Sequence, residues 1–170
     1  FQQVATAQWN TDTALNRAAN ILASFYSDGT ILDAWLCSND STALGVAQAI
    51  ETDYAEDNAI IVTGQDGDIA NLANIVDGKQ TMTVYKNVKN EAVVTLELAK
   101  AMLTGEVDGA ALAAGLPVDC AFDVESYEKT PGNKVPSFLL VPSVITVDNL
   151  QELVDTGLYT MGADGYLQAN

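Results

Sequence analysis

The sequence contains no histidine, which removes the commonest general base and the commonest metal ligand of proteins. A serine or cysteine nucleophile activated by histidine is therefore excluded within these 170 residues. The two cysteines, Cys37 and Cys120, are too few for a disulfide framework and lack the spacing of a zinc site. Cys37 lies in an apolar run and is expected to be a buried thiol, with a Cys37–Cys120 disulfide as the alternative. We expect no metal, no cofactor and no catalytic residues.

Basic residues are also scarce, since 7 Lys and Arg face 23 Asp and Glu and give a net charge of −16. Such an acidic chain repels phosphate backbones and anionic lipid surfaces, so no nucleic acid is expected as a partner. No apolar run reaches the roughly 18 residues of a membrane span. The chain does not begin with methionine and opens directly into an expected strand, which predicts a fragment whose signal sequence lies elsewhere.

The most informative stretch is Leu32–Ile50. A short apolar run, Ala34–Cys37, stops at Ser38-Asn39-Asp40, and a helical pattern of apolar residues then begins at once. This order predicts a buried strand, a tight polar turn and a helix. In a parallel sheet such a turn lies at the carboxyl end of its strand, which is the edge where these sheets bind ligands.

The same order of strand, turn and helix recurs along the first hundred residues. Strands are expected at Val4–Ala7, Ala34–Cys37, Ala59–Thr63 and Thr81–Tyr85, with helices from Thr11 or Asp12 to Tyr26, after Asp40, after Asp68 and over Asn90–Leu103. Repeats of this kind predict an α/β fold with a doubly wound parallel sheet. The pattern weakens after Gly105, where we expect a strand at Cys120–Val124, an extended segment at Lys134–Leu140, a helix ending near Asp155 and a poorly ordered tail from Gly162 to Asn170.

Four chemically useful side chains directly follow the expected strands: Trp9, Asn39, Asp66 and Lys86. An aromatic face covers the apolar side of a pyranose ring, while amide, carboxylate and ammonium groups bond vicinal hydroxyls, so this set predicts a site for a neutral polyol.

Each residue also has a structural interpretation without a ligand. Asn39 or Asp40 can cap a helix, Asp66 before Gly67 is a common turn residue, Trp9 can be core and Lys86 a solvated surface lysine.

Several strings carry a resemblance to a family. They are Ser38-Asn39-Asp40 with Ala43-Leu44-Gly45, Val62–Asp66, Thr83–Asn87, Val135–Leu140 and Val144–Asn149. In this order and spacing the chain resembles the type I periplasmic sugar-binding proteins of ABC importers, in particular the xylose-binding and multiple-sugar-binding members.

The resemblance implies two α/β lobes joined by chain crossings that close on a sugar. Residues 1–86 would form most of the second lobe without its first strand and helix, 87–133 a segment of the first lobe, and 134–170 the return crossing, last helix and tail. It further implies that Asn39, Asp66 and Lys86 bond the sugar, that Trp9 or its neighbourhood supplies the stacking ring, and that Lys86-Asn87 is a hinge. Family ligands from the absent parts, including an arginine, have no counterpart here.

Three function classes remain open at this point. The favoured one is a receptor that delivers a pentose or hexose to the membrane subunits of an ABC importer, at the periplasmic or lipid-anchored cell surface. The second is the sugar-sensing core of a transcriptional repressor, which resembles the same fold. The third is an enzyme in which Asp66 and Lys86 serve as base and acid, although no nucleophile or metal set accompanies them.

The resemblance also predicts an incomplete sheet. In a 2-1-3-4-5 strand order, Val4–Ala7 would be the second strand and Ala34–Cys37 the third, so the strand between them is missing. We expect the gap to be filled by a companion fragment, by a second copy of the chain as a homodimer, or by Val4–Ala7 sliding inward to pair with Ala34–Cys37.

Overall fold

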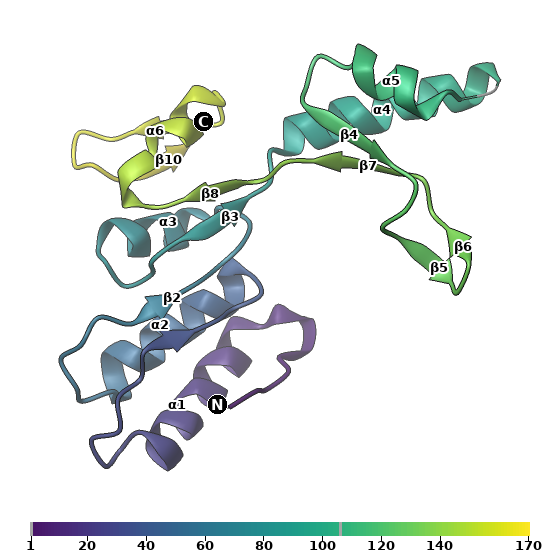
Figure 1. Ribbon diagram of the computed structural model, residues 1–170. Helices are drawn as coiled ribbons and strands as arrows, with labels where there is room; N and C mark the ends of the chain where they lie inside the picture. Colours follow the sequence, from purple (N-terminus) through teal and green to yellow (C-terminus); the bar gives the residue numbers. More distant parts are fainter. Residues whose placement is uncertain (1, 106) are drawn as a thin grey trace. The chain divides into compact units, whose positions relative to one another are not determined.

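A computed structural model describes residues 2–105 and 107–170, and the chain divides into two compact units. The first unit comprises residues 2–85 and 143–170, and the second comprises Lys86–Pro142. The chain passes between them at Tyr85–Lys86 and again at Pro142–Ser143 (Figure 1).

The first unit is the α/β part of the chain. Its elements are the 3₁₀ turn η1 (Ala7–Trp9), α1 (Thr11–Phe25), β1 (Ala34–Trp35), α2 (Asp40–Asp53), β2 (Ile61–Val62), α3 (Ile69–Val76), β3 (Thr83–Tyr85), β8 (Ser143–Ile145), η2 (Val147–Asn149), α6 (Gln151–Asp155), β9 (Tyr159–Met161) and β10 (Leu167–Ala169).

The sheet of this unit is parallel from β1 to β3, as predicted. β1 pairs in parallel with β2, and a parallel bridge between Gln65 and Val84 joins the segment after β2 to β3. β8, which was not predicted from the sequence, pairs antiparallel with β3, with Tyr85 opposite Ser143. The two crossings between units therefore leave from neighbouring strands. The segment Lys134–Leu140, expected as part of the return crossing, belongs to the second compact unit.

Asparagine side chains begin three of the helices. Asn10 accepts a hydrogen bond from Thr13 N and caps α1, in place of the expected Thr11 or Asp12. Asn39 caps α2, and Asn87 caps α4, which therefore starts at Val88 and not at Asn90. An asparagine carbonyl satisfies one of the backbone N–H groups that a helix leaves unpaired at its start.

Two hydrophobic clusters hold the first unit together. One joins α1, α2 and β2, and its buried members are Ala18, Leu22, Leu32, Ala43, Val46, Ala49 and Val62. The other lies around α3, β3 and α6, and its buried members are Leu72, Ile75, Tyr85, Ile145, Leu150, Leu153 and Leu167. Gly45 lets α2 approach α1 closely, because a Cβ there would overlap Thr11 O and lie 2.8 Å from Leu15 N.

The C-terminal segment is ordered, so the expectation of a loose tail from Gly162 is wrong. β10 pairs antiparallel with β9, with Leu167 opposite Met161, and Leu167 is only 3 % exposed. Gly165, with a φ of +85°, allows the turn between the two strands. Burial of one leucine thus fixes a polar segment that has no strong periodicity of its own.

The N-terminal segment does not form the expected strand. Residues 2–6 have no regular structure, and η1 follows, with Gln8 and Trp9 at φ of 56° and 50°. Within the described chain β1 pairs with β2 alone, so the expectation that Val4–Ala7 slides inward to pair with Ala34–Cys37 is also wrong. A groove of about 430 Å³, lined by Gln2–Val4 and Ala34–Leu36 among others, lies along β1.

The second unit contains the long helix α4 (Val88–Thr104), α5 (Gly109–Gly115), β4 (Cys120–Asp123), β5 (Glu128–Thr130), β6 (Asn133–Lys134) and β7 (Ser137–Leu140). β4 and β7 pair antiparallel, and the rings of Phe122 and Phe138 meet across them at 5.2 Å. β5 and β6 form a separate hairpin. Within the described residues, no helix combines the length and apolarity that a membrane span requires.

Candidate functional site

The loops that follow β1 and β2 lie against each other at the carboxyl end of the parallel strands. The backbone N–H of Asp40 donates to Gln65 O at 2.8 Å, and Asp66 N donates to Val84 O at 3.0 Å. The structure therefore places Asn39 and Asp66, two of the predicted sugar ligands, on adjacent loops.

Asn39 is half-buried and caps α2 with one end of its amide only. Its Oδ1 accepts from Thr42 N at 3.2 Å and from Thr42 Oγ1 at 2.8 Å. Its Nδ2 group has no partner among residues 2–105 and 107–170. Capping and donation to a sugar hydroxyl are thus compatible, because they use different atoms of the same side chain.

Asp66 is exposed and has an unusual backbone. Its φ of +119° lies in a region that non-glycine residues rarely occupy, at a cost on the order of 1–3 kcal/mol. Such strain persists only where the surroundings fix the backbone, and it is concentrated at functional sites. Gly67 follows with a φ of +84°, and a Cβ there would lie 2.8 Å from the Tyr85 ring.

Asp40, which is fully buried, supplies several of the contacts that fix this loop, beside the bond from Asp66 N to Val84 O. Its Oδ2 accepts from Gly67 N and Asp68 N, each at 2.9 Å. Its Oδ1 accepts from Gln80 Nε2 at 3.1 Å, and Thr83 Oγ1 lies within hydrogen-bond distance of both oxygens. A side chain expected to cap its own helix instead ties α2 to the next loop and to β3.

Electrostatics at this edge reflect burial of acidic groups. Burial raises the pKa of Asp40 although the donors around it act in the opposite direction. Burial and the charge of Asp66 raise the pKa of the Asp68 carboxyl. Tyr159, whose hydroxyl donates to Gly67 O at 3.1 Å, has its pKa raised mainly by burial and further by Tyr85.

Trp9 lies beside the β1–α2 loop but not in the core. Its side chain is 61 % exposed, and it lines a groove of about 290 Å³ together with Leu36, Cys37 and Ser38, the residues just before Asn39. The interpretation of Trp9 as a core residue is therefore wrong, and an exposed ring stands within the same unit as Asn39 and Asp66.

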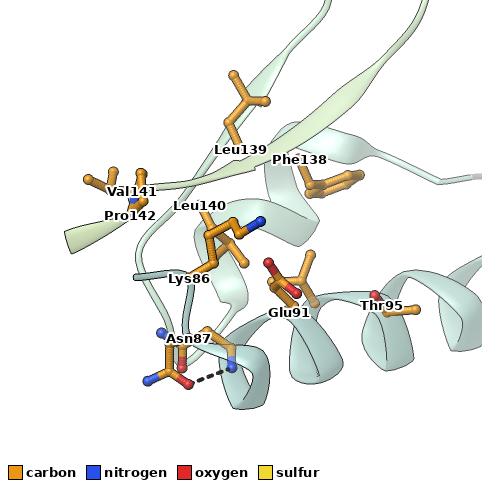
Figure 2. Close-up of a pocket in the computed structure, with 11 residues that line it drawn as sticks. Lys86, Asn87, Glu91, Thr95, Phe138, Leu139, Leu140, Val141 and Pro142 are labelled. Atoms are coloured by element: carbon orange, nitrogen blue, oxygen red, sulfur yellow. Dashed lines mark hydrogen bonds between the residues drawn. The ribbon is translucent and has the colours of Figure 1, made fainter. Parts of the chain in front are cut away.

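Lys86 is the first residue of the second unit and lines a pocket of about 440 Å³ there. Figure 2 shows its side chain in this pocket, between the start of α4 and the end of β7. The other lining residues are Asn87, Asn90, Glu91, Val94, Thr95, Phe138, Leu139, Leu140, Val141 and Pro142. An aromatic ring, an ammonium, a carboxylate and a hydroxyl thus surround one space.

Sequence reasoning missed the buried polar network around Asp40. Asn71 Nδ2 donates to Asp40 O at 2.8 Å and to Gln80 Oε1 at 2.7 Å, and Asn71, Gln80 and Thr83 are each at most 2 % exposed. The sequence does contain a signal for this network, namely polar residues at positions that face the core. Asn71 lies in an otherwise apolar helix, and Thr83 lies in a strand. Among the described residues no cluster of potential metal ligands forms.

Comparison with known proteins identifies relatives of this arrangement. Residues 1–107 match the family model described as periplasmic binding protein domain. A multiple sugar-binding periplasmic protein of Azospirillum brasilense is 31 % identical over 94 % of this chain and 42 % of that protein. The D-xylose-binding periplasmic protein of Escherichia coli K12 is 30 % identical over 86 % of this chain and 39 % of that protein. The chain thus spans less than half the length of these curated relatives.

Solved structures give the same picture. A solute-binding protein of an ABC transporter from Clostridium phytofermentans, with bound β-D-glucose, is 44 % identical with a TM-score of 0.78 over 94 % of this chain and 46 % of that one. A carbohydrate transporter solute-binding protein from Chloroflexus aurantiacus, in complex with D-glucose, is 28 % identical with a TM-score of 0.64 over 98 % of this chain and 44 % of that one. These relatives are binding proteins and not enzymes.

Proposed function

Because this chain belongs to the periplasmic binding protein family, we propose that it is part of a receptor that binds a monosaccharide without covalent chemistry. The observation that carries the proposal is the pair of adjacent strand-end loops that present Asn39 and Asp66. A receptor is favoured over the sensing core of a repressor, because the curated relatives are periplasmic sugar-binding proteins.

In this proposal each predicted ligand residue has a distinct role. Asp66 accepts hydrogen bonds from two neighbouring hydroxyls, Asn39 donates through Nδ2, and Lys86 donates to a further hydroxyl. The exposed ring of Trp9, or another ring near it, covers an apolar face of the sugar.

The ligand class that we propose is an aldopyranose such as D-glucose or D-xylose. Two relatives were solved with D-glucose, and one curated relative is named for D-xylose. The two sugars share their ring hydroxyl arrangement and differ in one hydroxymethyl group, so the same polar residues can serve both.

A thermal-shift screen of the full-length protein tests this function. D-Glucose and D-xylose should raise the melting temperature in a concentration-dependent way, because a ligand that binds only the folded state stabilises it. L-Glucose at the same concentrations is the matched control and should have no effect. No shift with any pentose or hexose would refute a monosaccharide receptor.

We further propose that the receptor is located in the periplasm or is held at the cell surface by a lipid anchor. There it delivers its sugar to the membrane subunits of an ABC importer. Residues 1–86 would form most of one sugar-binding lobe and 87–133 a segment of the other, with Lys86-Asn87 as a hinge. Support comes from the change of compact unit at Tyr85–Lys86, since hinges are short segments at the ends of elements.

A further strand is proposed to pair with the open edge of β1, in the groove beside Ala34–Leu36. Unpaired strand edges readily accept another strand. A companion polypeptide is favoured over a second copy, because two chains of net charge −16 repel each other. Light scattering of the 170-residue chain by itself tests the second copy, since a homodimer would have twice its mass of 18.0 kDa.

A further inference from the structure

The Asp40 carboxylate is surrounded by uncharged donors that come from separate parts of the chain. Two are backbone N–H groups of the loop after β2, one is the Gln80 amide and one is the Thr83 hydroxyl. Buried carboxylates need such partners, because an unsatisfied charge in the interior is strongly destabilising.

These bonds bracket Asp66 on both sides. The backbone N–H of Asp40 donates to the carbonyl oxygen of Gln65, the residue before Asp66. The Asp40 carboxylate accepts from the backbone N–H of Gly67, the residue after Asp66. Asp66 therefore lies between two residues that are held by hydrogen bonds. Its φ of +119° is unfavourable for aspartate, so the backbone would relax to another conformation without these bonds.

We propose that Asp40 is the positioning residue of the sugar site: by holding Gln65 and Gly67 it fixes the backbone of Asp66, so that the Asp66 carboxylate points at the ligand. This inference rests on the proposed function. Asp40 itself contacts no sugar, because its side chain is fully buried.

The start of α2 does not require the Asp40 side chain. Asn39 already caps the helix through Thr42, and the Asp40 carboxylate makes its bonds to Gly67, Asp68, Gln80 and Thr83. Asparagine at position 40 would keep the shape but place an amide NH₂ against donors, so two N–H groups would face each other where a bond now exists. Whichever way the amide turns, its NH₂ would face either Gly67 N and Asp68 N or Gln80 Nε2, so the effect falls on this network and on the loop that it holds.

A double-mutant cycle in the full-length protein tests the proposal, with the dissociation constant for D-glucose measured by calorimetry. Asp40→Asn alone should raise that constant at least tenfold. In an Asp66→Ala background, Asp40→Asn should raise it less than twofold further, because the group that Asp40 positions is already gone. An equal rise in both backgrounds would mean general structural damage and would overturn the proposal.

Three further variants control for misfolding and for unrelated effects of charge on D-glucose binding. Thr83→Val removes one donor and should weaken D-glucose binding less than Asp40→Asn, while Thr83→Ser keeps the hydroxyl and should restore the affinity. Asp28→Asn is the matched control and should leave the affinity unchanged, because Asp28 is exposed and, among the described residues, accepts hydrogen bonds from Thr30 alone. Failure of Thr83→Ser to restore what Thr83→Val loses contradicts the proposal.

Amide hydrogen exchange gives a readout that needs no sugar. In Asp40→Asn, the Gly67 and Asp68 amides should exchange at least tenfold faster, while amides in the middle of α1 stay unchanged. If Asp66→Ala alone leaves D-glucose affinity unchanged, the sugar site fails and the exchange rates decide the role of Asp40 by themselves. Unchanged exchange at Gly67 and Asp68 would overturn it.

Discussion

The Asp40 carboxylate lies 2.9 Å from the backbone N–H of Gly67, although 27 positions separate the two residues. This bond joins the start of α2 to the loop after β2, and both loops carry a predicted sugar ligand. The edge of the sheet is thus held by a buried polar network and not by apolar packing alone.

Gly64→Ala should destabilise the protein by about 2–4 kcal/mol, as the sum of overpacking and loss of buried hydrogen bonds. A Cβ at this position would overlap the Asp40 carboxylate and come to 2.5 Å from Gln80 Nε2. Chemical denaturation measures the change. Gly115→Ala is the control and should shift stability by about 1 kcal/mol or less, since nothing lies within 4 Å of its Cβ position. Equal effects of the two substitutions would show that the network does not fill this space.

Gly45→Ala should lower the free energy of unfolding by about 1–3 kcal/mol, although alanine favours helices by about 1 kcal/mol. The added Cβ would meet backbone atoms of α1 at Thr11 and Leu15, which cannot move aside as a flexible side chain can. A denaturation midpoint equal to or above that of the parent protein would show that α1 and α2 do not pack as closely as described here.

The parallel part of the fold could be predicted from the sequence because its signals are local. The apolar runs at Ala34–Cys37 and Ala59–Thr63 end in polar turns, and each turn leads into a helical pattern. Periodicity and turn residues are enough to place such repeats.

The errors have non-local causes. The strand expected at Val4–Ala7 needs a neighbour to pair with, and β1 pairs only with β2 in the described part of the chain. The segment from Gly162 is ordered because Leu167 packs into a core built from α3 and α6. The local sequence around Leu167 does not indicate this long-range contact. The role of Asp40 depends on donors 27 to 43 positions away.

Cys37 should react more slowly than Cys120 with iodoacetamide at pH 8. Burial raises the pKa of the Cys37 thiol to about 12. The reactive thiolate is then on the order of 10⁻⁴ of the total at pH 8. Cys120 is less buried, and both thiols are free. Mass spectrometry of the labelled peptides gives the two rates, and urea should make them equal. Faster labelling of Cys37 in the folded protein would contradict the burial described for it.

The measurement closest to the central claim is calorimetry of D-glucose binding to the full-length protein and to its Asp66→Ala variant. A carboxylate that accepts from two hydroxyls makes two charge-assisted bonds of about 1.5–3 kcal/mol each, so their loss should weaken binding by roughly 10² or more. Asn39→Ala and Lys86→Ala should have smaller effects, because in the proposed site only Asp66 accepts from two hydroxyls. An Asp66→Ala variant that binds D-glucose with the dissociation constant of the parent protein would contradict the site proposed here.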